Sequence, residues 1–371
     1  MKFSISSAEL LSKIQLANGA IGSNMVVPIL EDYLFIINNN KLTISATDLE
    51  TSITTDVDVI ADEDGSVAIP GKILFDTLKA LPEQPITIEV DQKKFSIEIT
   101  SSYGKYKLSG DNPEDFPAIP QAENTERVSI SAHLLKEAIN KTIFATTNDE
   151  LRLAMTGVYT QIDFSKITFV ATDAHKLVKY TFSGLEGDVN TSFILPKKSL
   201  TLLRSALPDN GSVEISFNKS NAFFSFDDHH LVCRLIDAQY PNYNAVIPVD
   251  NPNLLVVVRR DLLNSLKRIA IYANKTTNQV HMNIDDGSLT IEAQDLDFSN
   301  EATEQLTCQY EGTPVTIGFN AKFLIEMLSV LDTDEIRMEL STPNKAGIIH
   351  PSESPDDEEL LMLVMPVMLS R

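Results

Sequence analysis

Hydrophobic and polar positions along the chain follow two periods, and the order of those periods repeats. The stretches ITIEVDQKKFSIEITSSYGKYKLSG (86–110) and SVEISFNKSNAFFSFDDHHLVCRLI (212–236) alternate at a period of two, which is typical of successive antiparallel strands. Apolar positions at helical spacing occur in 7–19, 71–81, 131–146, 196–207, 259–273 and 320–331. The pattern predicts an α+β chain with two helices and roughly eight strands in each repeat.

Four sets of landmarks recur along the chain at a spacing near 125 residues. They are the lysines Lys72, Lys197 and Lys322, the aspartates Asp48, Asp173 and Asp295, the prolines Pro117, Pro241 and Pro366, and helix-like segments that open at Ser7, Ser131 and Arg259. This period exceeds that of solenoid repeats, so we expect three tandem copies of one whole domain. The predicted domains are 1–121, 127–246 and 252–371, joined by proline-bearing polar linkers.

Composition narrows the class of protein. The chain has 371 residues, of which 43% are hydrophobic, and no apolar run is long enough to span a bilayer. The N-terminal MKFSISSAEL lacks the apolar core of a signal peptide, so we expect a cytoplasmic protein with no membrane contact. Cys233 and Cys308 fit neither a disulfide framework nor a zinc site and predict two reduced, buried thiols. We expect no metal and no cofactor.

Charge is distributed unevenly between the predicted helices and the rest of the chain. The net charge is −22, yet the six helical segments hold 13 lysines and arginines against 5 acidic residues. Exposed helices favour lysine in any protein, but they favour glutamate equally, and glutamate is scarce in these segments. We therefore expect the helices together to face a polyanion.

The cations share one face of each helix. Lys72 and Lys79 are seven residues apart, which at ~100° per residue places them opposite Leu74 and Leu78. The same spacing relates Lys197 to Arg204 and Arg260 to Lys267. No zinc finger, dense basic run or tryptophan accompanies them, so contacts would reach phosphates without reading base sequence.

Three equal domains with helices on one side predict half of a ring, which two chains joined head to tail would close. Twelve helices at ~10 Å spacing give a circumference of ~120 Å, and subtracting helix radii leaves a hole roughly 28 Å wide. Duplex DNA passes through a hole of that size.

Several motifs resemble one known family along the whole chain. They are MKFSISSAELL at Met1, VPIL at Val27, TDLE at Thr47, VATDAHKLV at Val170, GFNAKFLIEML at Gly318 and VMPVML at Val364. The chain resembles the bacterial DNA polymerase III beta subunits, the DNA sliding clamps. The resemblance implies a homodimeric ring that encircles duplex DNA. It also implies that the ring tethers the replicative DNA polymerase and other proteins with clamp-binding motifs, is opened by an ATP-driven clamp loader, and catalyses no reaction.

Three groups of site residues follow from the helix pattern and from this resemblance. The residues expected to face DNA are Lys13, Asn24, Lys72, Lys79, Lys136, Lys141, Lys197, Lys198, Arg204, Arg260, Lys267 and Lys322. The residues expected in a partner-peptide pocket between the second and third domains are Met155, Thr172, Ala174, His175, Lys176, Leu177, Pro241, Ala245, Val246, Leu363, Val364, Met365, Pro366, Val367 and Met368. The residues expected at the dimer interface are Lys105, Tyr106 and Lys107, meeting Ile271, Tyr272, Asp297, Glu301 and Glu304 of a second copy.

The pocket motif departs from the family pattern at three positions. Ala174 replaces the usual glycine, Lys176 replaces the usual arginine, and Ala245 stands where the pocket rim commonly has an arginine. These changes bear on the choice of peptide and leave the pocket itself in place. For Met365 and Pro366, plain strand core is an equal alternative.

Two other classes of protein are open on sequence grounds. A β-rich hydrolase with paired carboxylates would need one repeat to carry chemistry that the others lack, and none is so marked. A multidomain protein-binding scaffold would explain the repeats but not the cationic helices. His229 and His230 are adjacent on a predicted strand and point to opposite faces, which argues against a shared metal site.

Overall fold

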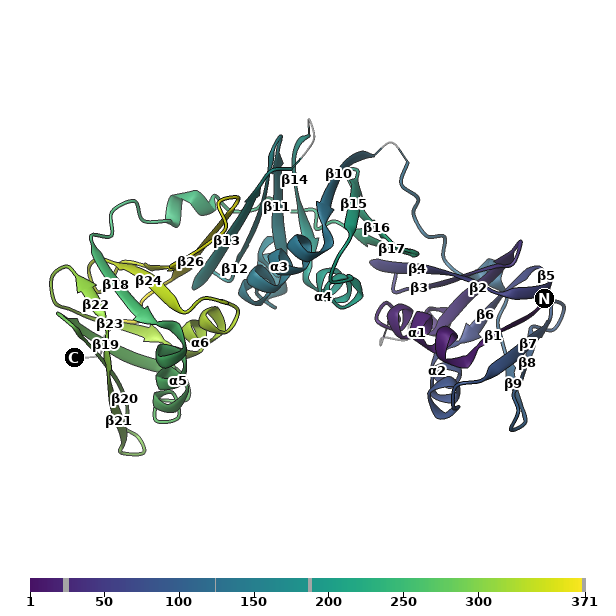
Figure 1. Ribbon diagram of the computed structural model, residues 1–371, viewed down its shortest axis with the longest axis horizontal. Helices are drawn as coiled ribbons and strands as arrows, with labels where there is room; N and C mark the ends of the chain where they lie inside the picture. The colour runs from purple at the N-terminus through teal and green to yellow at the C-terminus, as the bar shows by residue number, and fades with distance from the viewer. Residues whose placement is uncertain (23–26, 124, 186–188, 369–371) are drawn as a thin grey trace. The chain divides into compact units, whose positions relative to one another are not determined.

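The computed structural model describes residues 1–22, 27–123, 125–185 and 189–368 (Figure 1). Within these residues it has six α-helices, and every strand pairing is antiparallel. The helices are α1 (Ser7–Asn18), α2 (Gly71–Ala80), α3 (Ala132–Thr142), α4 (Lys197–Ala206), α5 (Arg259–Ile269) and α6 (Ala321–Ser329). The predicted α+β class, with two helices in each repeat, is confirmed.

Strands fill most of each repeat. The first repeat holds β1 (Lys2–Ser6), β2 (Asp32–Asn38), β3 (Lys41–Thr47), β4 (Thr51–Asp58), β5 (Ile60–Glu63), β6 (Gly65–Pro70), β7 (Pro85–Asp91), β8 (Ser96–Thr100) and β9 (Lys105–Ser109). The second holds β10 (Glu126–Ser131), β11 (Gly157–Asp163), β12 (Lys166–Thr172), β13 (Lys176–Ser183), β14 (Asn190–Pro196), β15 (Ser212–Phe217), β16 (Asn221–Phe226) and β17 (His229–Arg234). The third holds β18 (Asn253–Val258), β19 (Gln279–Asp285), β20 (Ser288–Asp295), β21 (Asn300–Thr307), β22 (Gln309–Glu311), β23 (Val315–Asn320), β24 (Glu335–Leu340), β25 (Gly347–Pro351) and β26 (Glu358–Val364).

The chain forms two compact units. The first unit comprises Met1–Lys136 and Lys198–Leu235, and the second comprises Glu137–Lys197 and Ile236–Arg371. The middle repeat contributes to both units. The domain limits expected from the 125-residue period remain predictions.

The first unit contains two sheets and a pair of packed helices. The sheet orders are β5-β1-β7-β8-β9 and β10-β15-β16-β17-β4-β3-β2-β6. Helix α1 packs on β1, β3 and β4, while α2 packs on β2 and β6, so the core lies between the helices and the strands. Tyr33, Phe35 and Phe3 are among its largest fully buried side chains.

The second unit repeats this plan. Its sheet orders are β14-β11-β12-β13-β26-β25-β24-β18-β22 and β21-β20-β19-β23. Helices α5 and α6 pack together, with α5 on β18, β20, β21 and β24 and α6 on β23 and β26. Phe319, Met327 and Leu266 are fully buried there.

Each unit contains one seam at which a sheet passes from one repeat to the next. In the first unit β4 pairs with β17, and in the second unit β13 pairs with β26. Both β4 and β13 follow a turn that begins with Thr-Asp, at Thr47-Asp48 and Thr172-Asp173, which we call the TD turn. In both cases, the strand after the TD turn pairs with the last strand of the next repeat. The corresponding strands β21 and β9 each lie at the edge of a sheet.

The helices present the faces that the sequence predicts. Leu74, Leu78 and Leu203 are buried, whereas Lys72 and Lys79 on the opposite side of α2 are exposed. The thirteen cations and five anions all fall within the observed helices. The concentration of positive charge on helices is therefore a property of the folded chain.

Two of the predicted helices end four residues earlier than expected. The segment 131–146 is α-helical only to Thr142, where φ is −118°, and continues as a 3-10 turn, Ile143–Ala145. The segment 259–273 is α-helical only to Ile269. After it, the N–H groups of Ile271 and Tyr272 bond three residues back, at 3.2 and 3.0 Å, in the tighter 3-10 manner.

Candidate functional site

The turn between β12 and β13 is held by a single aspartate. Asp173 Oδ1 accepts hydrogen bonds from the N–H groups of His175 and Lys176, both at 2.9 Å. Ala174 between them has φ 76°, in the left-handed region that favours glycine. The family's usual glycine at this position therefore has a backbone reason, and Ala174 adopts the same conformation at a cost.

The first repeat builds the same turn. Asp48 Oδ1 accepts from the N–H groups of Glu50 and Thr51 at 3.0 and 2.7 Å, and Leu49 has φ 76°. Asp48 and Asp173 therefore have the same structural role, which is to hold a tight turn by accepting two backbone N–H groups.

Lys176 joins this turn to α6. Its side chain is buried, and its Nζ lies 2.9 Å from Asp173 Oδ2 and 3.0 Å from Glu326 Oε2. The same ammonium lies over the ring of Phe323, 4.5 Å from its centre, and the exposed His175 ring stacks on Phe323 at 6.1 Å. The second and third repeats are thus linked by charge as well as by strand pairing.

The strand seam brings the predicted apolar pocket residues together. Leu177 pairs with Leu363 and Lys176 with Val364, and the N–H of Met365 donates to the His175 carbonyl at 2.9 Å. Beyond Val364 the chain leaves β26, and Val367 forms an isolated bridge with Gly318 within β23. The C-terminal segment thus lies between the TD turn and the third repeat.

A buried hydrophobic cluster includes residues of the paired strands β13 and β26 at this seam. It contains Val170, Leu177, Ile194, Tyr240, Tyr243, Ala346, Ile348, Leu361 and Leu363. The Tyr240 ring stacks on Tyr159 with the ring centres 4.7 Å apart, and the Tyr240 hydroxyl donates to the Val170 carbonyl at 3.3 Å. The floor of the candidate pocket is therefore buried and apolar.

The predicted pocket residues differ in accessibility. The exposed ones are Ala174, His175, Pro241, Ala245, Val246, Met365 and Met368, those of intermediate exposure are Met155, Pro366 and Val367, and the buried ones are Thr172, Lys176, Leu177, Leu363 and Val364. Met368 is 79% exposed and Val246 56%, which is high for apolar side chains. The exposed members are the ones available to a ligand.

Two residues at this site were missed by the sequence interpretation. Arg152 donates through Nη1 to the Asp173 carbonyl at 2.7 Å and through Nε to Asp149 Oδ2 at 2.9 Å, which braces the turn from outside the motif. No pattern around Arg152 indicates this role. Phe323 could have been found, because it lies inside the GFNAKFLIEML stretch. It is partly buried, whereas the neighbouring Lys322 is exposed.

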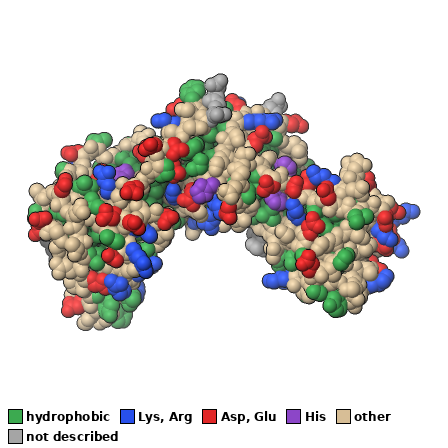
Figure 2. All heavy atoms as spheres, viewed as in Figure 1, with side chains coloured by type: hydrophobic (Ala, Val, Ile, Leu, Met, Phe, Trp, Pro, Cys, Tyr) green, Lys and Arg blue, Asp and Glu red, His purple; other side chains and the backbone are tan. Residues whose placement is uncertain are grey.

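Many of the helix cations predicted to face DNA have acidic partners in their own unit. Lys13 lies 3.6 Å from Asp228, Lys136 2.7 Å from Asp209 and Lys141 3.3 Å from Glu358, and Lys198 pairs with Asp48. On the face drawn in Figure 2, blue and red side chains are likewise interspersed. These ion pairs compete with phosphate contacts, because a phosphate must displace the carboxylate.

The exposed members of the predicted set are Lys72, Lys79, Lys198, Arg260, Lys267 and Lys322. Lys197 donates to Asn148 Oδ1 at 3.1 Å and is half-buried, as is Arg204. Asn24 lies outside the described residues.

The residues predicted for the dimer interface lie at two separate places. Tyr106 on β9 lines a pocket of about 760 Å³ together with Ile73, Thr77 and Leu81 of the α2 region. In the second unit, Ile271 and Tyr272 are 64% and 44% exposed just beyond α5. Both places therefore offer accessible apolar side chains.

The charged residues of the predicted interface form bonds within the chain. Lys105 and Lys107 lie 2.5 and 3.2 Å from Glu98. Arg268 donates hydrogen bonds to both carboxylate oxygens of Glu304, at 2.7 and 2.6 Å. Asp297 and Glu301 are exposed. These contacts bear on which charges can meet across an interface.

Other expectations concern metals, thiols and membranes. Across the described ranges, His, Cys, Asp and Glu side chains form no group of three or more placed to hold a metal ion. Cys233 and Cys308 are buried free thiols, and burial raises the pKa of Cys233 to about 12. No helix in the part of the chain that the structure describes is long and apolar enough to cross a bilayer.

Comparison with known proteins covers the whole chain. Family models of the DNA polymerase III beta subunit match residues 1–120 (N-terminal domain), 129–242 (central domain) and 244–367 (C-terminal domain). The beta sliding clamps of Synechococcus elongatus and Vibrio cholerae are each 28% identical, with 100% of both chains covered.

Solved structures agree with the family models. A DnaN sliding clamp from Pseudomonas aeruginosa bound to griselimycin is 27% identical, with a TM-score of 0.94 and 100% of both chains covered. The DNA polymerase sliding clamp from Bacillus subtilis is 26% identical, with the same TM-score and coverage.

Three consecutive clamp domains, each with two helices and antiparallel sheets, define the class of protein as a DNA sliding clamp. The chain belongs to the DNA polymerase III beta subunit family.

Proposed function

We propose that two copies of this chain join head to tail into a ring that encircles duplex DNA. In this proposal the ring tethers the replicative polymerase and other partners through a peptide site at the second seam. A separate loader opens and places the ring, and the clamp itself catalyses no reaction. In this proposal the clamp acts in the cytoplasm.

The observation that supports this proposal is the order in which strands of successive repeats pair. At both seams within the chain, the strand after the TD turn pairs with the last strand of the following repeat. The same rule assigns β21 of the third repeat to β9 of a first repeat, and both strands end their sheets. Pairing would satisfy two strand edges that otherwise invite aggregation.

The number of chains follows from the size of the hole. If β21 and β9 of one chain closed on each other, six helices at ~10 Å spacing would give a circumference of ~60 Å. After the helix radii are subtracted, an opening of roughly 9 Å remains. Duplex DNA cannot enter such an opening, whereas the twelve helices of two chains leave roughly 28 Å.

The alternation of side chains along β9 and β21 indicates which charged residues can meet at this interface. Tyr106 faces the α2 side of its sheet, so Lys105 and Lys107 lie on the other face. Glu304 bonds Arg268 of α5, so it lies on the helix side of β21, and Glu301, three residues before it, lies on the opposite face. We therefore propose that Lys105 and Lys107 meet Glu301, and that Glu304 positions α5.

The state of assembly tests the ring directly. Light scattering of the purified chain should give twice its mass of 41.0 kDa. Ile271→Asp places a charge in the proposed interface and should shift the protein to the monomer. Val249→Asp, at an apolar side chain that is fully exposed in a linker, is the control and should stay dimeric. A monomeric wild-type chain at micromolar concentration would contradict the proposal.

Retention on DNA tests encirclement. A clamp placed by its loader on nicked circular DNA should remain bound, and the same clamp should be lost when the circle is cut, because a ring slides off a free end. Equal loss from both forms would instead support the alternative function, a protein-binding scaffold that does not encircle DNA.

The peptide site is proposed at the second seam because apolar side chains are exposed there above a buried apolar cluster. Val246, Met365 and Met368 can accept the apolar anchors of a short partner segment, and methionine adapts to more than one partner. His175 and Arg152 border the turn that forms one wall.

Substitutions in one linker test this site. Val246→Asp should weaken binding of a clamp-binding peptide at least tenfold in fluorescence anisotropy, since it charges an apolar wall. Val249→Asp, three residues further along, should bind as the wild type does. Equal affinity of both variants would place the peptide elsewhere.

A further inference from the structure

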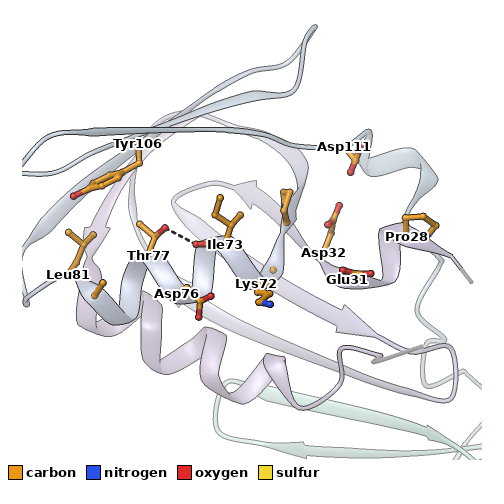
Figure 3. A pocket seen from close by; sticks show the side chains of 13 residues that line it. Pro28, Glu31, Asp32, Lys72, Ile73, Asp76, Thr77, Leu81, Tyr106 and Asp111 are labelled. Atoms are coloured by element: carbon orange, nitrogen blue, oxygen red, sulfur yellow. Dashed lines mark hydrogen bonds between the residues drawn. The ribbon is translucent and has the colours of Figure 1, made fainter. Parts of the chain in front are cut away.

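The pocket beside α2 has an acidic end that the clamp function does not use. Glu31, Asp32 and Asp111 line it together with Pro28, and Figure 3 shows Asp32 and Asp111 directed toward each other. Tyr106 and Leu81 lie at the other end of the same pocket (Figure 3). The pocket therefore combines facing carboxyl groups with apolar walls.

Asp32 is an unusual residue for a protein interior. It is only 4% exposed, and its Oδ2 is buried without a hydrogen-bond donor. A buried carboxylate normally requires a donor or a positive charge to offset the loss of water. Here the group that faces it is the carboxyl of Asp111.

The backbone holds both acids in place. Asp32 opens β2 and pairs with Pro70 of β6. Asp111 forms a two-bond bridge with Ala68, two residues earlier on β6, with N–O distances of 2.9 and 3.2 Å. Gly110 permits this approach, because a Cβ there would lie 2.6 Å from the Ala68 carbonyl oxygen. The backbone of both residues is therefore fixed beside β6.

No positively charged side chain of the described residues neutralises the pair. Burial, the facing Asp111 carboxyl, a hydrogen bond between the two carboxyl groups and then Glu31 raise the pKa of Asp32 to about 7, so a shared proton competes with a metal ion below that pH. Lys72 lines the pocket but makes no ion pair with either acid among the described residues. The fold thus keeps two carboxyl groups together where one positive charge would stabilise both.

We propose that Asp32 and Asp111 form a binding site for a hard divalent cation, Mg²⁺ or Ca²⁺. Magnesium is commonly held by one or two carboxylates while it keeps several of its waters. The pocket of about 760 Å³ has room for a hydrated ion, and its opening gives the ion a route of entry. A site of two carboxylates agrees with the finding that no group of three metal-binding side chains occurs in the described residues.

Thermal unfolding at constant ionic strength tests the site with the metals alone. At a hundredfold excess over Kd, MgCl2 or CaCl2 should raise the midpoint of the wild-type chain by about 5–10 °C. Asp32→Asn and Asp111→Asn should each lose most of this shift. Asp76→Asn removes a carboxylate from the same pocket wall without touching the pair, and it should keep the shift.

A second measurement separates specific binding from general attraction to an acidic protein. The chain has no tryptophan, so Tb³⁺ luminescence can be sensitised only through its tyrosines, and Tyr33 and Tyr106 lie near this pocket. Tb³⁺ should give a saturable signal that Ca²⁺ competes away and that Asp32→Asn lowers at least tenfold in affinity. Equal signals from wild type and Asp32→Asn, or an unchanged thermal shift, would overturn the proposal.

Stability without metal distinguishes a binding role from a structural one. Above about pH 7, where Asp32 is ionised, Asp32→Asn should raise the midpoint of the metal-free protein, because an amide can donate to Asp111 where a carboxylate cannot. A lower midpoint would contradict the picture of two unneutralised acids. If Asp32→Asn does not fold, Asp111→Asn decides the matter, since Asp111 is exposed and bridges β6 through its backbone alone. All these groups lie in the first unit, but Tyr106 at the other end of the pocket belongs to the proposed dimer interface, so the metal-dependent shift should also appear in the monomeric Ile271→Asp variant.

Discussion

Single residues set the geometry of the recurrent TD turn. Asp48 and Asp173 each accept two backbone N–H groups, and the residue after each aspartate is left-handed at φ 76°. Leu49 and Ala174 occupy a conformation that costs a residue with a Cβ about 1–2 kcal/mol. The turn is stable because the aspartate bonds and the strands on either side outweigh this cost.

Ala174→Gly should therefore stabilise the protein. Relief of the left-handed strain exceeds the backbone entropy that glycine loses on folding, about 0.4–1 kcal/mol. The expected gain is about 0.5–1 kcal/mol in the free energy of unfolding of the second unit, measured by urea denaturation. Ala245→Gly, at an alanine outside the left-handed region, should be destabilising, and a gain there of equal size would refute the explanation.

His229 should make stability depend on pH. It lies at the first seam, where its Nδ1 is 2.8 Å from Thr55 Oγ1 and its ring packs edge-on against Phe226. Burial and then the Lys13 charge lower its pKa below 6.5, against the opposing pull of Asp228 and Asp227.

Because the folded pKa is the lower one, the unfolded chain takes up the proton first as pH falls. The contribution of His229 is therefore complete above about pH 6.5 and declines below it. Unfolding measured from pH 7.5 to 5 should show a smaller loss of stability in His229→Gln than in the wild type. His230→Gln, at the exposed neighbour, should keep the wild-type slope.

Elements of the two seams share a backbone plan but differ in chemistry. In both, a residue at or just after the end of the last strand donates its N–H to the carbonyl of the residue two after the turn aspartate. Arg234 donates to Glu50 at 2.8 Å, and Met365 donates to His175 at 2.9 Å. At the first seam the Thr51 and Ser199 hydroxyls bond each other at 2.7 Å. At the second seam Lys176 occupies the position that corresponds to Thr51. Its ammonium contacts Asp173, Glu326 and the ring of Phe323.

The buried charge of Lys176 should matter for stability. Lys176→Met leaves Asp173 and Glu326 without their cation, which should cost about 1.5–3 kcal/mol in the free energy of unfolding. Lys179→Met, on the same strand, removes a looser pair with Glu359 at 3.6 Å and should cost about 0–1 kcal/mol. Chemical denaturation followed by circular dichroism measures both, and equal costs would show that the buried network contributes little.

The elements were largely predictable from sequence because their signals are local. Alternation at a period of two marked β7–β9 and β15–β17, and leucine spacing marked the buried faces of α2 and α4. Helix ends were predicted less well, because the 3-10 turns after Thr142 and Ile269 depend on backbone angles that composition does not encode. The strand pairings at the two seams were not predicted, because they join segments far apart in the sequence.

The candidate sites show the same difference between local sequence signals, which were predictable, and long-range contacts, which were not. Residues of the TD turn and the C-terminal segment stood in readable motifs, and the strand register then brought them together. Arg152 and the Asp32–Asp111 pair could not have been predicted, because each depends on contacts between segments distant in sequence. The ion pairs of Lys136 and Lys141 were likewise invisible, since Asp209 and Glu358 lie 73 and 217 residues away.

At the scale of the whole molecule, net charge and local charge act in opposite directions. A chain of net charge −22 should repel DNA, yet its six helices carry thirteen cations and five anions. Phosphate contacts release counterions, so the salt dependence of binding counts the cations that take part. This dependence separates helix lysines from lysines elsewhere on the surface.

The triple variant Lys72→Ala, Lys197→Ala and Lys322→Ala removes the corresponding helix cation from each repeat. If these lysines face DNA, log K against log salt for a short linear duplex should lose up to about 2.7 in slope, at about 0.9 for each phosphate contact. The matched control is Lys93→Ala, Lys219→Ala and Lys345→Ala, which removes exposed lysines from strand-connecting turns, again one in each repeat. Both variants change the net charge equally, so general repulsion from an acidic molecule cancels between them. A loss of slope confined to the first variant would identify the helix lysines as the contacts, whereas equal losses would show that DNA responds only to total charge.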